Sequence, residues 1–356
     1  MKILLLSRYG RIGASSRVRS YQYLSYLRQH GIQITVSPLL GDDYLSAWYA
    51  GDANYLHARI LPYLQRLLRL LTSYRFDVLW IEYELFPWLP ACGEMLLKWL
   101  NIPYIVDYDD ATFHRYDAHS SQIVRFFFGK KIKRVMHDAT IVIVGNDYLA
   151  QYAQAAGATR VEYVPTVVDL EQYHAMSPSP DKGFTIGWIG TPITVKYLEL
   201  VRPILSRIFQ SSHARLVSVG SELPGFDQAH VIFRTWTENS EVSEIQQFDV
   251  GIMPLTDELW NKGKCGYKLI QYMACGKPVI ASPIGVNTKI VEHGVNGFLA
   301  DSSDEWFHAL TLLCDHPDLR KKMGEAGRKK VEKEYSLQVT QSRLLSILQS
   351  VRKGHQ

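Results

Sequence analysis

The chain has 356 residues, which is too long for one ordinary core and suits two domains of about 150 to 200 residues each. The net charge of +4 is too small to predict nucleic-acid binding, so we expect no nucleic-acid partner. The 4 cysteines are scattered without metal-ligand spacing, which argues against structural zinc and fits a reducing cytoplasm. No apolar stretch approaches the roughly 18 residues that span a bilayer, and the apolar run at the N-terminus is too short for a signal peptide. These features predict a cytoplasmic protein.

The first half of the sequence alternates strand and helix patterns. An apolar run at residues 2–7 predicts the first strand, and the turn-rich SRYGRIGASSR follows it. Apolar residues then keep helical spacing up to Gly31, and Ser15 or Ser16 is expected to cap the start of that helix. Asn146 is expected to cap a later helix. Further strands are predicted at residues 32–39, 77–83, 103–110 and 139–145.

The second half repeats this pattern after a change in composition. Residues 165–183, PTVVDLEQYHAMSPSPDKG, are rich in proline, serine and charge, and we place the interdomain linker there. Strands are predicted at residues 184–190, 214–220, 230–236, 249–255, 278–283 and 296–301, and helices at 194–210, 303–314, 317–334 and 336–352. Because the strands are continuous apolar runs, they are typical of doubly wound parallel sheets covered by helices on both faces.

The stretch NKGKCGYKLIQYMACGKPVIASPIG, residues 261–285, places three lysines around two glycines in front of a short helix. Gly263 and Gly266 let the backbone approach a ligand closely, and Gly276 is expected to end the helix. A helix start and lysine charges both favour phosphate, so the stretch predicts a diphosphate site in the C-terminal half. The lysines are Lys262, Lys264 and Lys268.

Two more loops follow predicted strands. GWIGTPITVKYLE carries Lys196 one turn inside a helix start, where it either contacts phosphate or is a solvated lysine beside a tight turn. The first loop has Gly10 and Gly13 before its helix, so its backbone amides could approach an anion. It is not a G-x-G-x-x-G sequence, and no acidic residue follows about twenty positions later, which argues against a nicotinamide dehydrogenase.

Several segments resemble glycosyltransferase family 4. YMACGKPVIASPIGVNTKIVEHGVNGFLA (residues 272–300) is similar to the C-terminal signature of that family. VPTVVDLEQY (164–173), IGWIGTPITVKYLELV (186–201) and GRKKVEKEYS (327–336) resemble its other motifs. The resemblance covers essentially the whole chain, strongly after Gly183 and more weakly before it.

The resemblance implies the GT-B fold, in which two Rossmann-like domains face each other across a cleft. The expected divisions are an acceptor-binding domain at residues 1–170, a donor-binding domain at 171–335, and a C-terminal helix at 336–356 that returns toward the first domain. The implied activity is transfer of a hexose-type sugar from a UDP- or GDP-linked donor, with retention of anomeric configuration, and no metal or other cofactor is expected. Glycan or lipid-linked acceptors of polysaccharide or lipopolysaccharide assembly are implied.

Site residues are assigned from the loops and the resemblance together. Catalytic roles are expected for Asp109, Lys196 and Lys264, and acceptor-binding roles for Arg17 and Asp110. The donor-binding set is Gly13, Gly190, Thr191, Lys196, Gly263, Lys264, Cys265, Gly266, Tyr267, Lys268 and Gln271.

The sequence also departs from the family pattern. The Glu-x7-Glu acids of the family would stand at Gly263 and Gln271, and Thr191 stands where the family has a phosphate-binding arginine. Gln271 can still hydrogen-bond ribose hydroxyls, and Lys264 or Lys268 is expected to supply the missing charge. These departures leave open a degenerate, non-catalytic nucleotide-sugar-binding protein. A nucleotide-sugar epimerase with a similar fold is a second alternative, although the 272–300 signature fits the transferase better.

Asp109 stands where the family has a histidine that lines the donor-sugar pocket. With Asp107 it also reads as the Asp-x-Asp metal motif of the other large glycosyltransferase fold, and with Asp110 as a capping cluster at a strand end. All three interpretations stay open at this stage.

Two stretches mix basic and large apolar residues, namely residues 59–75 and 124–137. This composition predicts either surface helices that lie on an anionic membrane or amphipathic helices that pack on the sheet with their basic residues in water. In the first case the acceptor would be lipid-linked, and the protein would contact the inner face of the cell membrane.

Overall fold

The structure, a computed structural model, describes residues 1–49, 60–176 and 183–353, so the middle of the predicted linker and Arg59 lie outside the described residues. The chain forms two compact units. The first contains Met1–Thr166, Gly263–Cys265 and the chain from Thr340 onward, and the second contains Val167–Lys262 and Gly266–Val339. The segment Gly263–Cys265 thus differs from the expected division, which placed it in the C-terminal domain.

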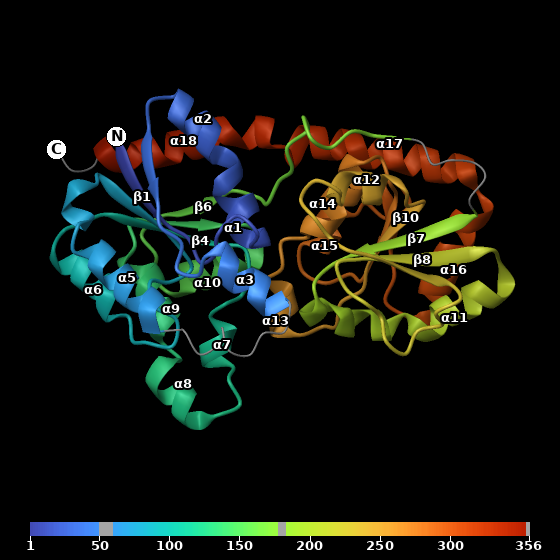
Figure 1. Ribbon diagram of the computed structural model, residues 1–356, viewed down its shortest axis with the longest axis horizontal. Coiled ribbons are helices and arrows are strands. Elements are labelled where there is room, and N and C mark those ends of the chain that lie inside the picture. Colours follow the sequence, from blue (N-terminus) through green and yellow to red (C-terminus); the bar gives the residue numbers. More distant parts are fainter. Residues whose placement is uncertain (50–59, 177–182, 354–356) are drawn as a thin grey trace. The chain divides into compact units, whose positions relative to one another are not determined.

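The first unit is built on a parallel sheet of six strands (Figure 1). The strands are β1 (Lys2–Leu6), β2 (Gln33–Val36), β3 (Val78–Glu82), β4 (Tyr104–Tyr108), β5 (Ile141–Val144) and β6 (Val161–Tyr163). Their order is β2-β1-β3-β4-β5-β6. Chain order reverses between β1 and β3, and ligands of such sheets bind beyond the carboxyl ends of the strands at that point.

Helices of the first unit connect these strands. They are α1 (Ala14–Arg19), η1 (Tyr21–Tyr23), α2 (Leu24–Gln29), α3 (Asp42–Tyr49), α5 (Ile60–Leu70), η2 (Ser73–Arg75), α6 (Cys92–Trp99), α7 (His114–Asp117), α8 (Gln122–Phe128), α9 (Lys131–Asp138) and α10 (Asp147–Ala155). Asn146 caps α10 as predicted, because its side chain accepts a hydrogen bond from the Leu149 amide at 2.9 Å. The last helix, α18 (Leu337–Lys353), bonds to this unit through Tyr23 and Thr340 (3.0 Å between hydroxyl oxygens) and through Arg160 and Ser350 (2.7 Å).

The first helix differs from its prediction in two respects. It was expected to run without a break to Gly31, but it is interrupted at Ser20, whose hydroxyl donates to the Ser16 carbonyl (2.8 Å) and competes with the helical backbone. Neither Ser15 nor Ser16 caps it, because Gly13 occupies the N-cap position. The Ser16 hydroxyl lies instead in the protein interior, where it bonds Glu82.

The second unit carries a parallel sheet of six strands in the order β12-β11-β10-β7-β8-β9, which is the strand order of a Rossmann fold. The strands are β7 (Phe184–Ile189), β8 (Ala214–Val219), β9 (Val231–Arg234), β10 (Val250–Met253), β11 (Val279–Ala281) and β12 (Gly297–Leu299). The helices are η3 (Pro192–Leu200), α11 (Arg202–Ser211), α12 (Glu241–Gln246), α13 (Leu259–Lys262), α14 (Tyr267–Ala274), α15 (Asn287–Ile290), α16 (Ser303–Asp315) and α17 (Pro317–Glu334). The prediction of two doubly wound parallel sheets is confirmed.

The helix predicted at residues 194–210 is two elements in the structure. A 3-10 helix, η3, ends before Val201, and α11 begins at Arg202. The reason is Pro203, which has no amide hydrogen to bond the Glu199 carbonyl and so interrupts a continuous helix. Gly276, with φ of +71°, ends α14 as expected, since this left-handed conformation favours glycine.

Candidate functional site

A glycine follows the carboxyl end of each of two neighbouring strands of the second sheet, Gly190 after β7 and Gly220 after β8. The Gly190 amide donates to the Val219 carbonyl (2.9 Å) and the Gly220 amide to the Arg234 carbonyl (2.8 Å). A Cβ atom on Gly220 would lie 2.6 Å from the Gly190 carbonyl oxygen and 3.2 Å from Trp236 Cβ, so only glycine fits there. Chain order reverses between β7 and β10 in this sheet, and Gly190 therefore lies where an α/β sheet binds its ligand.

Lys268 extends from the first turn of α14 to the loop that follows β7. Its Nζ lies 4.4 Å from the centre of the Trp188 ring and 3.4 Å from Thr194 Oγ1. A Cβ atom on Gly190 would lie 2.6 Å from the same Nζ. The lysine charge is thus held against the glycine of the β7 loop, as a phosphate site requires. Trp188 and its cation–π contact were not anticipated, because 80 residues separate the two side chains in the sequence.

The other predicted residues of this loop are arranged around η3. Thr191 precedes η3, and its amide donates to Thr194 Oγ1 (3.2 Å). Lys196 is exposed, and its Nζ lies 5.0 Å from the centre of the Tyr197 ring. The Tyr197 hydroxyl in turn donates to Asn261 Oδ1 (2.7 Å), which joins η3 to α13.

Gln271 is buried in a polar network of the second unit. Its amide donates to the Tyr173 hydroxyl (2.8 Å), which donates to the Glu241 carboxylate and lies 3.5 Å from the Tyr267 hydroxyl. Trp236 Nε1 donates to the same carboxylate at 2.7 Å. An acid therefore does lie in this network, but it comes from α12 and no sequence motif pointed to it. Gly266, which starts α14 with φ of +67°, would clash with Ile290 if it carried a Cβ atom (2.3 Å).

Gly263–Cys265 packs in the first unit because of Asn146. The Asn146 side-chain amide donates to the carbonyls of Gly263 (2.8 Å) and Lys264 (3.0 Å). Gly263 leaves no room for a side chain, since a Cβ atom would lie 2.5 Å from the Ala111 backbone nitrogen. The Lys264 charge consequently lies beside the acids that follow β4 and not in the second unit, where Lys268 lies.

Those acids are Asp109 and Asp110. Lys264 Nζ lies 3.8 Å from Asp110 Oδ1, and partial burial raises the pKa of Asp110 to about 6 although the Lys264 charge lowers it. Asp109 accepts a hydrogen bond from the Tyr83 hydroxyl, and burial, with the nearby Asp109 charge, raises the pKa of that phenol. Asp109 thus lies with Asp110 and Lys264 at one edge of the first sheet.

Asp107 has a different bonding partner from Asp109. It is buried and bonds Arg19, with distances of 2.9 Å to Nε and 2.8 Å to NH2. Within residues 1–49, 60–176 and 183–353, no three acidic, histidine or cysteine side chains are grouped so that they could hold a metal ion. Cys265 lies next to this ion pair, and burial raises the pKa of its thiol, so it is a neutral packing group.

Glu82 ends β3 at the point where chain order reverses in the first sheet, and sequence reasoning missed it. Its Oε2 accepts from the Arg8 amide (2.9 Å) and the Ser16 hydroxyl (2.5 Å), whereas Oε1 has no hydrogen-bond partner among the described residues. Burial raises the pKa of Glu82 to about 7. A half-satisfied buried carboxylate at a sheet switch point is suited to a ligand hydroxyl.

The loop after β1 is occupied by an acid of the same unit. Asp42 Oδ1 accepts from the Ile12 amide (2.9 Å) and lies 2.3 Å from the position of a Cβ atom on Gly10. Gly13 is similarly close to Tyr9, whose Cβ would lie 2.4 Å from an added Cβ. The glycines of this loop had suggested that its backbone amides could approach an anion. The Asp42 carboxylate already lies against the loop and disfavours a second anion there. Arg17, one of the two predicted acceptor-binding residues, is buried in α1.

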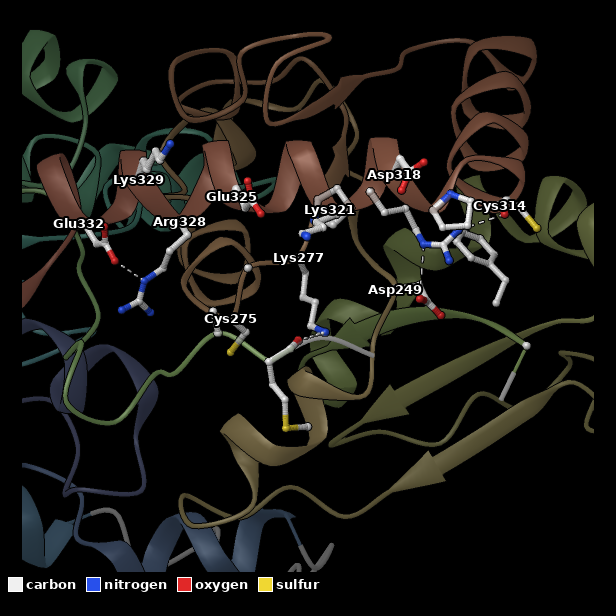
Figure 2. A pocket seen from close by; sticks show the side chains of 18 of the residues that line it. Asp249, Cys275, Lys277, Cys314, Asp318, Lys321, Glu325, Arg328, Lys329 and Glu332 are labelled. Atoms are coloured by element: carbon white, nitrogen blue, oxygen red, sulfur yellow. Dashed lines mark hydrogen bonds and ion pairs between the residues drawn. The ribbon is translucent and has the colours of Figure 1, made fainter. Parts of the chain in front are cut away.

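The second unit has a further cavity of about 860 Å³ that contains none of the predicted site residues (Figure 2). It lies at the amino ends of the strands, next to Phe184, Asp249 and Pro278, and α17 borders it. Lys277 Nζ donates there to the Met176 carbonyl (2.9 Å), and burial lowers the pKa of Lys277 to about 8. Because ligands of doubly wound sheets bind at the carboxyl ends, this cavity is not the donor site.

Two profiles of known families match the sequence. Residues 183–316 match the family described as glycosyl transferases group 1, and residues 17–166 match the family described as glycosyl transferase 4-like domain. A relative from Bacillus subtilis, the glycosyltransferase TuaH named for teichuronic acid biosynthesis, is 24% identical over 261 residues, or 67% of this chain and 63% of that protein. The match thus spans less than two thirds of that relative's length.

Solved structures with low identity share the whole fold. Sucrose-phosphate synthase from Thermosynechococcus elongatus superposes with a TM-score of 0.72 at 12% identity and covers 99% of this chain and 100% of its own. The Anabaena protein HepE in complex with UDP superposes with a TM-score of 0.70 at 17% identity and covers 98% of this chain and 100% of its own.

Proposed function

The chain belongs to the group 1 glycosyl transferases, and from this premise we propose that it moves a hexose-type sugar from a nucleoside-diphosphate donor to a glycan or lipid-linked acceptor. The observation that carries the proposal is the placement of the Lys268 ammonium beside Gly190 at the switch point of the second sheet. A positive charge thus lies beside the loop that follows β7, at the edge of the sheet where ligands of this fold bind. UDP or GDP is the proposed leaving group.

The reaction needs little beyond positioning and charge. The bond between the anomeric carbon and the phosphate oxygen breaks while the acceptor hydroxyl oxygen bonds the same carbon on the same face, so that configuration is retained. The hydroxyl proton passes to the departing phosphate oxygen. Lys268 and Lys196 would stabilise the departing diphosphate, which removes the need for a metal ion. Arg17 and Asp110 keep their proposed acceptor-binding roles. Asp109 and Lys264, which lie beside Asp110 in the first unit, keep their proposed catalytic roles.

The relatives and the surface of the first unit support the proposed class of acceptor. TuaH is named for teichuronic acid biosynthesis, and we propose a role in polysaccharide or lipopolysaccharide assembly here. The proposed place of action is the inner face of the cell membrane. In residues 1–49, 60–176 and 183–353 no helix is both long and apolar enough to cross a bilayer. The proposed contact with the membrane is a peripheral one, through basic and apolar side chains of the first unit.

Calorimetric titration with UDP, GDP, ADP and CMP, with and without EDTA, tests the donor site. Binding of one nucleoside diphosphate that survives EDTA is the expected result, and binding that requires Mg²⁺ or Mn²⁺ would contradict the metal-free proposal. Lys196→Ala and Lys264→Ala are each expected to lower turnover at least about tenfold without loss of fold, since one such charge typically contributes a few kcal/mol. Near-normal turnover in both would refute the roles of these two lysines.

A second candidate rests on Gly263 and Gln271, which replace the two acids of the family motif. Gln271 bonds Tyr173 and carries no negative charge. If the two missing acids are needed for transfer, the chain would hold a nucleotide sugar without transferring it. Turnover distinguishes the two, because a binding protein would retain the nucleotide sugar and release no free nucleotide.

A further inference from the structure

Helix α5 turns one of its two arginines inward and most of its leucines outward. Among the residues of α5, Ile60–Leu70, the buried one is Arg66, whose NH2 donates to the carbonyls of Ser7 (2.7 Å) and Ser37 (3.0 Å). Leu64 and Leu67 on the same helix are about half exposed, at 51% and 50%. A helix that only covers a sheet shows the reverse arrangement, so this apolar face has another use.

The outward leucines of α5 meet those of α6 in a groove of about 660 Å³ on the first unit. Leu64, Leu67 and Leu71 line it from the α5 side, and Leu96 and Leu100 from the α6 side. Figure 1 shows the two helices next to each other in the first unit. A groove lined almost wholly by hydrocarbon side chains suits a hydrocarbon ligand.

The surroundings of this groove are basic. The acids of residues 60–75, 92–100 and 122–138 are Glu94, which is buried and accepts from the Leu85 amide, and Asp138, which accepts from Lys98 and Arg134. Exposed or partly exposed basic side chains of these ranges are Arg69, Arg75, Lys98, Arg125, Lys130, Lys133 and Arg134. This surplus of positive charge complements anionic lipid headgroups.

Helix α8 adds an aromatic tip to the same unit. No residue of Gln122–Phe128 is buried, and Ile123, Phe126 and Phe127 are 71%, 83% and 69% exposed. Figure 1 shows α8 projecting away from the first sheet. Large apolar side chains next to Lys130 and Lys133 are typical of a helix that enters the headgroup region of a bilayer.

We propose that this surface binds an anionic phospholipid membrane and that the α5–α6 groove takes a single acyl chain of one lipid. The phenylalanines of α8 enter the bilayer surface while the basic side chains meet the headgroups. Binding itself does not depend on transfer chemistry. Its purpose, to bring the protein to a lipid-linked acceptor, rests on the proposed function.

Two measurements test the two parts of this proposal. Sedimentation with vesicles of phosphatidylglycerol and phosphatidylcholine is expected to show binding that is lost with phosphatidylcholine alone and weakened by salt. Calorimetry with lysophosphatidylglycerol below its micelle concentration is expected to show one molecule bound per chain. The double variant Leu64→Asn/Leu96→Asn should weaken both at least about tenfold, whereas Phe126→Ser should weaken only vesicle binding.

Leu200→Asn/Leu259→Asn in the second unit is the matched control, because these leucines are similarly exposed, at 44% and 51%. It should behave as the parent in both measurements. The proposal is overturned if the parent ignores anionic vesicles at low salt, or if the groove variant binds lysophosphatidylglycerol as tightly as the control. Titration with UDP and with GDP separates the two hypotheses. Binding of either nucleotide without lipid binding refutes the groove alone, and lipid binding without binding of either nucleotide refutes the donor site alone.

Discussion

Replacing Lys268 with methionine tests the donor site most directly. Methionine keeps the length of the side chain in α14 but removes the ammonium that lies 4.4 Å from the centre of the Trp188 ring. A unit charge about 4 Å from a phosphoryl oxygen contributes about 4 kcal/mol at an effective dielectric constant near 20. Part of this energy is already present in the bound donor, and the remainder appears as charge develops on the leaving diphosphate. We therefore expect kcat/KM to fall by roughly a hundredfold to a thousandfold.

Gly190→Ala reaches the same group without removing the charge. The added methyl would lie 2.6 Å from Lys268 Nζ and 2.5 Å from Trp188 Cζ2, so the ammonium must move. Its effect on kcat/KM should be comparable. Lys262→Met is the matched control from the same glycine-rich stretch, because the Lys262 ammonium pairs with Asp257 at 3.0 Å on the surface.

The assay is release of nucleoside diphosphate coupled to product formation, with calorimetric titration of UDP or GDP on the same samples. Thermal unfolding confirms that each variant is folded. A Lys268→Met protein with kcat/KM within about threefold of the parent, and with unchanged nucleotide affinity, would refute the reasoning, since a charge at 4 Å cannot be worth so little.

Three further predictions concern stability and pH. Burial lowers the pKa of Lys277 from 10.5 to about 8, so the charged form of this lysine opposes folding. The free energy of unfolding should therefore rise as pH increases from 8 to 10.5. In Lys277→Met the thermal unfolding midpoint should depend less on pH over this range. Burial raises the pKa of Glu82 from 4.5 to about 7, so the free energy of unfolding should fall as pH rises from 4.5 through 7. Glu82→Gln should remove this dependence of stability on pH. The same variant should raise the KM for the acceptor without changing nucleotide affinity. Asn146→Ala removes the cap of α10 and the hydrogen bonds to Gly263 and Lys264, and should lower the free energy of unfolding in urea by roughly 2–4 kcal/mol. Asn146→Ser can still cap the helix, so it should recover only about 1 kcal/mol of this loss. An unchanged urea midpoint for Asn146→Ala would show that the 263–265 segment is held by other contacts.

Sequence patterns predicted most of the strands, because the central strands of both sheets are largely buried apolar runs. β6 (Val161–Tyr163) was missed, since it is a partly buried strand of three residues with a glutamate at its centre. The bounds of α17 at Pro317–Glu334 were also predicted, since proline starts that helix and the pattern stops at Tyr335. The breaks at Ser20 and Val201 were not, because one depends on a side-chain hydrogen bond and the other on a missing amide at Pro203.

The site was only partly predictable for a related reason. The sequence offered three lysines around two glycines, but only the contact with Trp188 shows that Lys268 belongs to the sheet edge of the second unit. The contact with Asp110 shows that Lys264 belongs to the first. The amphipathic pattern of α5 was visible, but a pattern cannot say which face turns inward, and here a single arginine, Arg66, decides it.

The way in which the chain is shared between its units bears on synthesis by the ribosome. The chain leaves the first unit after Thr166, returns for Gly263–Cys265 and returns again at Thr340. At about 5–20 residues per second, roughly 10 to 40 s separate the synthesis of Arg160 from that of its partner Ser350, which is 190 residues later. During that interval the first sheet has formed strands but lacks its closing helix, so the nascent first unit is exposed to chaperones and proteases. A stop codon in place of Thr340 should therefore damage the first unit, which loses its last segment, more than the second unit, which it leaves complete.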